Sequence, residues 1–456
     1  MKLHELSLTQ MLGAIAQRRC TPLEIVRACL QQIATHEPRI GAWVHPIAED
    51  GVLQVWQSEA RGRGRSLLQG LPVGVKDTID VAKMPAERGS AIWRGRVAQE
   101  DAACVSLLKS VGAFVLGKTV TTEFAYFQPG KTANPHNDRH TPGGSSSGSA
   151  AAVAAGMVPV ALGSQTAASV IRPASYCGIA AWVATRGAIS LRGVMPLAQS
   201  CDSLGVLARD VHDLLLMEGC LRRTTERAEA MEPKVLIALD PNGLLDSEMG
   251  AAYEAALAAL SAKGLRIERS SLGAYTGDWN ASHARVMAYE AAQNLAFEYQ
   301  CARADLSDPL RQLIEHGMEL SAETHAQDLA YLADTSRVVT GVLQDHAVLI
   351  APAATGAAPL CSAGTGRPDM SRPWQWLGLP QACLPCARSV DSFPLGIQLV
   401  GRPNRDRELL RQALWLQQHL GWQAGNGAES VITPAVLIHR PSGIAEKSKG
   451  DRNDYL

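Results

Sequence analysis

The sequence lacks a long hydrophobic run, an excess of charge of one sign and a paired pattern of cysteines. Its longest weakly apolar stretch, residues 150–163, contains glycine and proline and is too short to span a bilayer. The 456 residues carry a formal net charge of −1, so no electrostatic feature indicates nucleic acid or an anionic membrane as a partner. Because the N-terminus also shows no signal-peptide pattern, we expect a cytoplasmic protein.

The ten cysteines stand singly, mostly among apolar neighbours, which is typical of reduced thiols packed as small hydrophobic side chains. Cys383 and Cys386 form one CxxC pair, but no second pair and no cluster of histidines accompanies it. A zinc or redox site usually needs such companions. We therefore expect neither a metal nor a cofactor.

The composition and the order of the apolar segments indicate the fold class. Apolar residues make up 46% of the chain and charged residues 19%, which is ordinary for a folded enzyme. Strand-like runs at residues 71–75, 114–116 and 158–162 alternate with helical stretches at residues 102–111 and 149–155. This alternation predicts an α/β fold with a mixed or parallel sheet covered by helices.

The character of the chain then changes. Residues 235–239 are typical of a strand and residues 251–262 of a helix, and residues 282–345 are largely helical with few breakers. Strand-like runs return at residues 348–351 and 397–400. We expect one α/β domain over residues 1–440, with its core in residues 60–215 and 345–420 and a variable helical segment at residues 220–345. Residues 441–456 are expected to form a polar tail.

One apparent nucleotide-binding motif does not have the physical character of a phosphate loop. Gly112-Ala-Phe-Val-Leu-Gly117-Lys118-Thr119 matches the phosphate-loop pattern letter for letter. A phosphate loop must turn tightly so that its backbone N–H groups face the phosphate, whereas Ala-Phe-Val-Leu is typical of a buried strand. We interpret Gly112 as the residue that ends the preceding helix, and we expect no nucleotide binding.

Two serines and one lysine are candidates for acyl-transfer chemistry. Ser145 lies in the glycine-rich stretch Gly143-Gly-Ser-Ser-Ser-Gly148, and Ser169, 24 residues later, ends Gly163-Ser-Gln-Thr-Ala-Ala-Ser. Lys76 follows the apolar run at residues 71–75, so its side chain is expected at a strand end inside the core. A serine hydroxyl needs a base to accept its proton, and a lysine serves as that base only when it is neutral. Together the three residues predict a nucleophile, a relay and a base.

The small residues before Ser169 allow backbone N–H groups to converge on one point. We expect the N–H groups of Thr166, Ala167, Ala168 and Ser169 to form an oxyanion hole. Such a hole is usually the largest electrostatic contribution to acyl transfer.

Several motifs, in the same order, resemble the amidase signature family of serine amidohydrolases. They include GLPVGVKD around Lys76, GGSSSGSAAAVAAG around Ser145, LGSQTAASVIRPASYCG around Ser169 and the C-terminal FPLGIQLVGRP. The resemblance implies the amidase-signature fold, an α/β fold with a central mixed, twisted sheet covered by helices on both faces. It implies the cleavage of a carboxylic amide to a carboxylate plus ammonia or an amine. It also implies Lys76 as the base, Ser145 as the relay serine after a cis peptide bond, and Ser169 as the nucleophile that forms an acyl-enzyme.

The sequence departs from the family pattern close to the nucleophile. Ala167-Ala168 replaces the usual Gly-Gly or Ala-Gly, and Gln165 stands where an aspartate is usual. If Ala168 had to take a backbone angle that only glycine adopts freely, the oxyanion hole would be misaligned. Residues 181–185 replace the family's Gly-Phe-Lys-Pro-Thr segment, and we expect an altered core turn there.

The candidate substrate contacts are Tyr126, Phe127, Ser146, Trp374 and Trp376. Core packing explains the four aromatic residues equally well. Because no cluster of arginines indicates an acidic substrate, we expect a small or aryl, largely neutral amide as the small-molecule partner.

Two other functions remain open. One is an amidotransferase subunit that supplies ammonia to a partner acting on tRNA, which a partner-dependent glutaminase activity would support. The other is a catalytically impaired protein of the amidase fold with a binding or assembly role, which the departures at Ala167-Ala168 and at residues 181–185 leave open. A homodimer also remains open.

Overall fold

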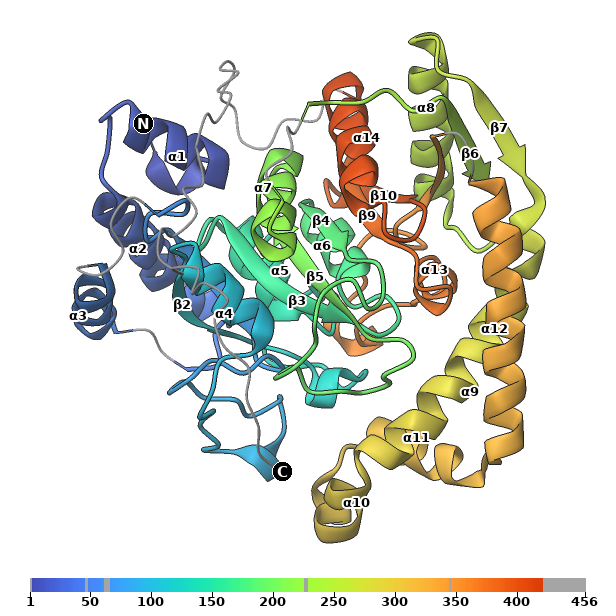
Figure 1. Cartoon of the computed structure of the whole chain (residues 1–456), viewed down its shortest axis with the longest axis horizontal. Helices are drawn as coiled ribbons and strands as arrows, with labels where there is room; N and C mark the ends of the chain where they lie inside the picture. The colour runs from blue at the N-terminus through green and yellow to red at the C-terminus, as the bar shows by residue number, and fades with distance from the viewer. Residues whose placement is uncertain (1, 46–47, 61–65, 225–228, 344–345, 421–456) are drawn as a thin grey trace, which may run out of the picture.

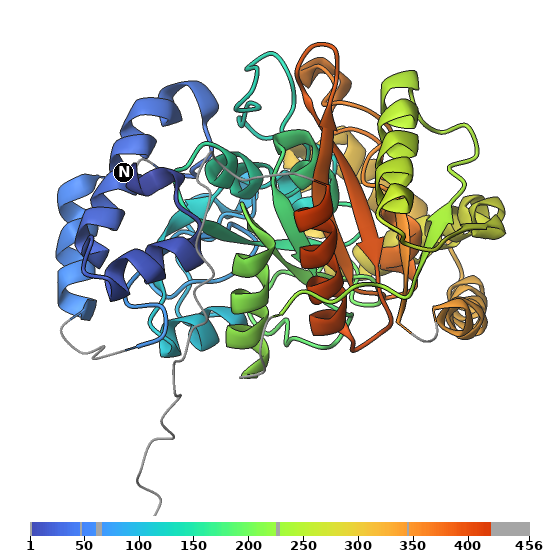
Figure 2. The same ribbon diagram turned by 90° about the horizontal axis from the view of Figure 1, so that it is seen from above.

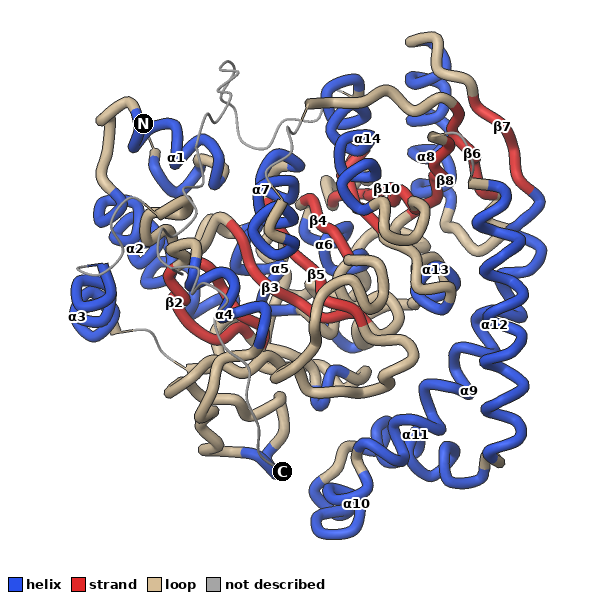
Figure 3. The backbone as a smooth tube through the Cα atoms, viewed as in Figure 1, coloured by secondary structure: helices blue, strands red, loops and turns tan. Residues whose placement is uncertain are grey.

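The computed structural model describes residues 2–45, 48–60, 66–224, 229–343 and 346–420 (Figure 1). The polar tail expected at residues 441–456 lies outside these ranges. Within them, ten strands form one sheet at the centre of the molecule (Figure 3). The strands are β1 (Pro72–Lys76), β2 (Phe114–Thr119), β3 (Val160–Gln165), β4 (Ala180–Val183), β5 (Ser203–Ala208), β6 (Val235–Leu239), β7 (Ile267–Ser270), β8 (Ala347–Pro352), β9 (Gln381–Arg388) and β10 (Pro394–Val400).

The sheet has parallel strands at its two ends and antiparallel strands in its middle. The order of the strands is β2-β1-β3-β5-β4-β9-β10-β8-β6-β7. β1 is parallel to β2 and β3, and β6 is parallel to β7 and β8. The pairs from β3–β5 to β10–β8 are antiparallel. The sheet is therefore mixed, as the resemblance implies; the alternation of segments alone also allowed a purely parallel sheet. Because β1 is flanked by β2 and β3 and fully buried, a side chain at its C-terminal end emerges inside the protein.

Helices cover both faces of the sheet. α7 and α14 pack side by side over one face, and α5 and α6 lie over the other (Figures 1 and 2). The helices are α1 (Leu8–Ala16), α2 (Pro22–Ile40), α3 (Glu49–Ala60), α4 (Ala103–Ser110), α5 (Ser147–Ala154), α6 (Ile171–Cys177), α7 (Val211–Arg222), α8 (Ser247–Ala262), α9 (Thr276–Asn294), α10 (Ala296–Ala302), α11 (Asp308–Glu319), α12 (Ala322–Val342), α13 (Arg372–Trp376) and α14 (Asp406–His419). Among the helices described, none is long and apolar enough to cross a membrane.

Local sequence determines where several elements begin and end. α2 starts at Pro22 because Thr21 caps it: the Thr21 hydroxyl accepts the N–H of Glu24 at 3.3 Å, and the Glu24 carboxylate accepts the N–H of Thr21 at 2.7 Å. Gly112 follows α4 with a φ of 92°, which suits a glycine after a helix end. The residues after Gly112 continue as β2, including Lys118, and pair with β1. The segment that matches a phosphate loop is thus a buried strand.

The helices α9, α11 and α12 form a layer at the opposite end of the molecule from α1, α2 and α3 (Figure 1). This layer shares a core with the sheet. In β8, Val348 and Ile350 face the main core, whereas Leu349 and Ala351 face the core beneath the helical layer. The alternation follows from the two-residue period of a strand. The helical segment is therefore packed directly on the sheet.

Candidate active site

Lys76 is the last residue of β1, and its side chain is fully buried. Its Nζ lies 2.6 Å from Ser145 Oγ, 3.0 Å from Ser164 Oγ and 3.1 Å from the Ser164 carbonyl oxygen. The carboxylate next to it in sequence, Asp77, pairs with Lys118 instead, at 2.9 Å. Burial lowers the pKa of Lys76 from 10.5 to about 7, although the negative charge of Asp202 opposes this shift. Lys76 is therefore a buried amine that can be neutral near pH 7.

Ser145 lies in a tightly packed glycine loop. The Gly144–Ser145 peptide bond is cis, as the resemblance implies. A Cβ on Gly144 would lie 2.7 Å from the Thr365 methyl carbon, so a larger residue would displace its neighbours. The Gly144 carbonyl accepts a hydrogen bond from Arg172 Nη2 at 2.7 Å, and the Ser145 carbonyl accepts one from the N–H of Thr122 at 3.3 Å. These contacts hold the Ser145 hydroxyl beside the buried amine.

Ser169 lies in the loop that connects β3 to α6, and this loop has unused backbone donors. The carbonyl oxygens of Thr166, Ala168 and Ser169 accept hydrogen bonds at 2.7–3.1 Å from His283 Nε2, the N–H of Arg172 and the N–H of Ser146, respectively. Among the hydrogen bonds of the described residues, none uses the N–H of Ala167, Ala168 or Ser169. Unpaired N–H groups are rare in buried segments. The loop therefore offers three adjacent donors to a ligand.

The alanines before Ser169 do not distort this loop. Ala167 and Ala168 are both described, and neither takes a positive φ. The condition under which the oxyanion hole would be misaligned, a glycine-like angle at Ala168, is therefore not met. Alanine is compatible with the backbone that the loop adopts.

Gln165, at the end of β3, accepts hydrogen bonds from backbone N–H groups through its side chain. Its Oε1 accepts the N–H groups of Val170 and Ile171 at 2.9 and 3.1 Å, at the start of α6. Its Nε2 donates to Gln375 Oε1 at 3.0 Å and to Gln381 Oε1 at 3.2 Å. An amide can both accept and donate, so Gln165 ties the Ser169 loop to two other buried glutamines. The residue that replaces the usual aspartate thus has a full set of partners.

Thr166 is held from two sides. Its Oγ1 donates to Asp202 Oδ1 at 2.6 Å, and its carbonyl accepts a hydrogen bond from His283 Nε2, on α9, at 2.7 Å. The other carboxylate oxygen of Asp202 accepts the N–H groups of Leu197 and Ala198 at 2.9 and 3.1 Å, and burial raises the pKa of Asp202 to about 6. Burial also lowers the pKa of His283 to about 3, so its imidazole is neutral at ordinary pH and donates through Nε2.

A cavity of about 20 Å³ lies where these elements meet. Its walls are formed by Ala125, Tyr126, Phe127, Ser145, Thr166, Ala167, Ala168, Ser169, Arg172, Leu197, Met287, Thr365 and Pro368. The structure thus brings both serines, the expected oxyanion loop and two of the expected substrate contacts to one cavity. The other three expected contacts do not line it. Ser146 is fully buried just before α5, and Trp374 and Trp376 are fully buried in the core beneath the helical layer.

Several residues that line the cavity are not among the site residues predicted from the sequence. Arg172 lies three positions after Ser169 and donates to Gly366 O at 2.6 Å and to Thr365 Oγ1 at 3.2 Å. Burial lowers the pKa of Arg172 to about 10. Its place next to the nucleophile motif is a signal that could have identified it. Met287 and Pro368 come from distant segments, and no motif marks them.

Comparisons with known proteins extend over most of the chain. A family model described as Amidase matches residues 24–410. A glutamyl-tRNA(Gln) amidotransferase subunit from Synechococcus elongatus is 28% identical over 474 aligned residues, covering 91% of this chain and 98% of that protein. Putative amidase AmiA2 from Mycobacterium tuberculosis is 30% identical over 459 residues, covering 91% and 93%. A solved structure described as a crystal structure of amidase has a TM-score of 0.83 at 25% identity, covering 91% of this chain and 100% of that one. The chain therefore belongs to the amidase signature family.

Proposed function

We propose that this protein is an amidase that hydrolyses a carboxylic amide to a carboxylate and ammonia or an amine. In this proposal Ser169 is the nucleophile, Ser145 relays its proton and Lys76 is the base. The observation that carries the proposal is the 2.6 Å contact between the fully buried Lys76 Nζ and Ser145 Oγ. An amine with a pKa of about 7 can both accept and return a proton at neutral pH.

The surroundings of Lys76 match the hydrogen-bonding capacity of a neutral amine. A neutral amine has two N–H donors and one lone pair. The Ser164 carbonyl and hydroxyl oxygens lie 3.1 and 3.0 Å from Nζ and can accept the two N–H groups. The lone pair is then left for the hydroxyl hydrogen of Ser145, at 2.6 Å. This assignment places a base next to the relay before any substrate binds.

The reaction then follows from proton transfers that balance. Lys76 takes the proton of Ser145 as Ser145 takes that of Ser169, and Ser169 Oγ attacks the amide carbonyl carbon. The unpaired N–H groups of Ala167, Ala168 and Ser169 would stabilise the negative oxygen that forms. The relayed proton passes to the leaving nitrogen as the C–N bond breaks. Water then attacks the acyl-enzyme and gives its proton to the same relay, and the relay returns this proton to Ser169 Oγ as the bond to the acyl carbon breaks and the carboxylate leaves.

The substrate and the cellular location are parts of the same proposal. Apart from the water that cleaves the acyl-enzyme, each step uses side chains and N–H groups of this chain, and the small cavity beside Ser169 suits the reacting carbonyl of a small-molecule amide. The ten cysteines are all free thiols in the described residues, which supports a reducing, cytoplasmic environment.

An amidotransferase subunit is the second candidate, because relatives that are subunits of glutamyl-tRNA(Gln) amidotransferase match this chain over nearly their full length. In that case glutamine would be the amide and the released ammonia would be used by a partner. A catalytically impaired scaffold has less support, because Ala167 and Ala168 leave the Ser169 loop without a positive φ.

A serine-reactive fluorophosphonate probe tests the proposal. We expect a covalent adduct that mass spectrometry maps to Ser169, and release of ammonia from a simple primary amide. Ser169→Ala should abolish both, and Lys76→Ala should weaken both, because the relay loses its base. Ser110→Ala is a matched control, since Ser110 is exposed at the end of α4. An adduct that persists in Ser169→Ala, or folded wild-type protein that forms no adduct, would overturn the proposal. Ammonia release from glutamine alone, among amides, would favour the amidotransferase function.

A further inference from the structure

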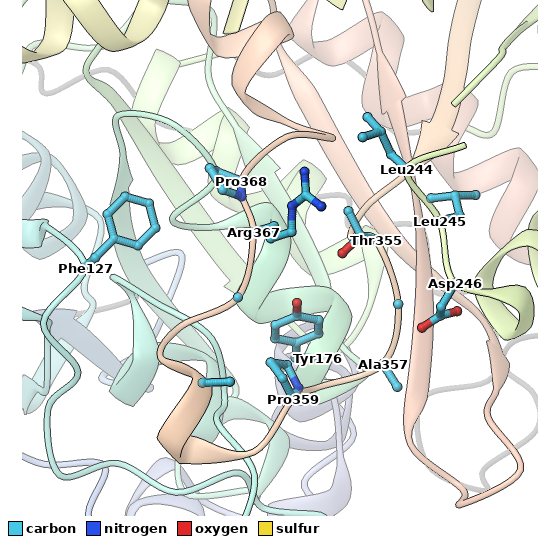
Figure 4. Close-up of a pocket in the computed structure, with 13 residues that line it drawn as sticks. Phe127, Tyr176, Leu244, Leu245, Asp246, Thr355, Ala357, Pro359, Arg367 and Pro368 are labelled. Carbon is cyan, nitrogen blue, oxygen red and sulfur yellow. The ribbon is translucent and has the colours of Figure 1, made fainter. Parts of the chain in front are cut away.

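A second, larger pocket adjoins the active-site cavity. Its volume is about 550 Å³ (Figure 4). Phe127 and Pro368 line both spaces, so the two spaces meet at these side chains. On α6, Arg172 lines the inner cavity and Tyr176, one helical turn later, lines the outer pocket. The two spaces are therefore neighbours that share one boundary.

The segment at residues 365–368 forms part of this boundary and is anchored on both sides. On the inner side, the Gly366 carbonyl accepts a hydrogen bond from Arg172 Nη1 at 2.6 Å. On the outer side, a Cβ on Gly366 would collide with the Tyr176 hydroxyl, so only glycine allows this close approach. Gly366 also has a φ of 84°, which glycine adopts without strain. These contacts hold residues 365–368 in place where the two spaces meet.

The sizes of the two spaces indicate how a substrate is divided between them. The inner cavity, at about 20 Å³, has room for little more than one water-sized group. It can receive the carbonyl oxygen of the reacting amide but not a substituent of several carbon atoms. The outer pocket, at about 550 Å³, lies within the range of sites that bind small molecules.

The lining of the outer pocket is mainly apolar and requires no charged ligand. Figure 4 shows Phe127 and Pro368 on one side and Leu244 and Leu245 on the other. Both charged side chains have a partner within the chain: Arg367 Nε donates to Asp369 Oδ2 at 3.0 Å, and Asp246 Oδ1 caps α8 by accepting the N–H of Met249 at 2.7 Å. An uncharged apolar or aryl group therefore fits this lining best.

One polar group of the pocket is uncommitted. Tyr176 is nearly fully buried, with 2% of its surface exposed. In Figure 4 its hydroxyl points toward the space between Arg367 and Thr355. Among the side-chain hydrogen bonds of the described residues, the one at Tyr176 is accepted by its carbonyl oxygen from Asn134 Nδ2 at 3.0 Å and does not use the hydroxyl. A hydroxyl that faces a pocket can donate to an acceptor on a bound ligand.

We propose that the outer pocket binds the non-reacting part of the substrate, and that the preferred substrates are uncharged amides carrying an extended apolar or aryl substituent. This inference rests on the proposed amidase function and names its substrate class. Phe127 and Pro368 flank the point where the substituent joins the reacting amide, and Tyr176 orients substituents that contain a hydrogen-bond acceptor.

Two substrate series test the inference. One lengthens the acyl side, from acetamide through butyramide to hexanamide, and the other enlarges the amine side, from acetamide to acetanilide. Each methylene that enters the pocket should raise kcat/KM up to about fourfold. Because hexanamide has about four more methylenes than acetamide, and acetanilide adds a whole phenyl ring, kcat/KM in one of the two series should rise at least tenfold. The series that rises assigns the pocket to the acyl or to the amine side. If kcat/KM stays level in both series while acetamide is hydrolysed, the inference is wrong and the amidase function stands.

A pocket-filling variant, Leu244→Trp, links this selectivity to the outer pocket. We expect it to reduce the ratio of kcat/KM for the large substrate to that for acetamide at least fivefold, and the ratio cancels any general loss of folding or chemistry. Val390→Trp is the control, because Val390 is 90% exposed outside both spaces and should leave the ratio unchanged. Tyr176→Phe should lower kcat/KM for 4-methoxybenzamide more than for benzamide. An unchanged ratio in Leu244→Trp would overturn the inference.

Binding without turnover separates the inference from the proposed function. Calorimetry of hexanamide with Ser169→Ala measures the pocket alone, and the affinity should fall in Ser169→Ala combined with Leu244→Trp. If no amide is hydrolysed but this difference is observed, the amidase function fails and the pocket assignment holds. If both proteins bind hexanamide equally, or neither binds it, the pocket assignment is wrong.

Discussion

The pH dependence of amide hydrolysis tests the role of Lys76 most directly. At about 1.4 kcal/mol for each pKa unit, lowering the pKa from 10.5 to about 7 disfavours the buried ammonium by about 5 kcal/mol. About half of the Lys76 side chains are then neutral at pH 7 and about nine in ten at pH 8, whereas an ordinary lysine is neutral in fewer than about one molecule in a hundred at pH 8. We expect kcat/KM to rise with an apparent pKa near 7 and to level off above about pH 8.

The assay is ammonia release from one amide between about pH 5 and about pH 10. Lys76→Arg should lose about 10²–10⁴-fold in kcat/KM, because a guanidinium stays charged and cannot accept the Ser145 proton. Lys109→Arg is the matched control: Lys109 pairs with Asp101 at 2.8 Å on α4, outside the cavity, and its substitution should leave the profile unchanged. A profile without an inflection near pH 7, or a Lys76→Arg variant with the wild-type profile, would refute the reasoning.

The same pKa shift makes folding depend on pH. The unfolded chain binds the Lys76 proton up to a pH near 10.5, whereas the folded chain releases it above about 7. Between these values the unfolded state holds more protons, so stability rises with pH, and below pH 7 the full cost of the buried ammonium applies. Lys76→Met removes this titration. We expect its Tm relative to wild type to be highest at low pH and the difference to shrink toward about pH 10. A constant difference would contradict the assigned shift.

Two further variants test the supports of the site and of the fold. His283→Phe removes the donor to the Thr166 carbonyl. Because the oxyanion loop then loses alignment, kcat should fall about tenfold while KM changes little. His283→Gln, which retains a donor, should recover most of the loss, and wild-type kcat in His283→Phe would refute this role. Asp406 accepts hydrogen bonds from Trp182 Nε1, Thr185 and Arg222 at 2.7–3.2 Å and thereby ties the divergent residues 181–185 to α14. Asp406→Ala should lower the free energy of unfolding in urea by about 3 kcal/mol, while the exposed control Asp391→Ala should not, and an unchanged urea midpoint would contradict the assignment.

The sequence predicts strands well where apolar runs are continuous. The runs at residues 71–75, 114–116 and 158–162 correspond to β1, β2 and β3, which are almost fully buried on both faces. It does not identify β4 or β5, because these short segments are rich in alanine, glycine and serine. They are strands because β5 lies between β3 and β4 and pairs with both. Pairing with distant segments, and not local propensity, determines their conformation.

The candidate site likewise contains some residues that the sequence identifies and others that it does not. Ser145, Ser169 and the loop between β3 and α6 are recognisable because the chemistry requires small residues within short motifs. The sequence does not distinguish aromatic residues that line the cavity from aromatic residues of the core. Phe127 lines the cavity, whereas Trp376 is fully buried in the core. Both residues favour burial, so only their positions in the folded chain distinguish a wall from a core.

The sequence by itself determined the family, the α/β class and the three side chains on which the proposed chemistry depends, because these properties reside in contiguous runs and motifs. Only the tertiary structure decided the rest. It buried Lys76 beside Ser145 and so lowered its pKa, it brought His283 from the helical layer onto Thr166, and it placed a small cavity next to a large pocket. Each of these depends on desolvation or on contacts between segments far apart in the chain, which no local pattern encodes.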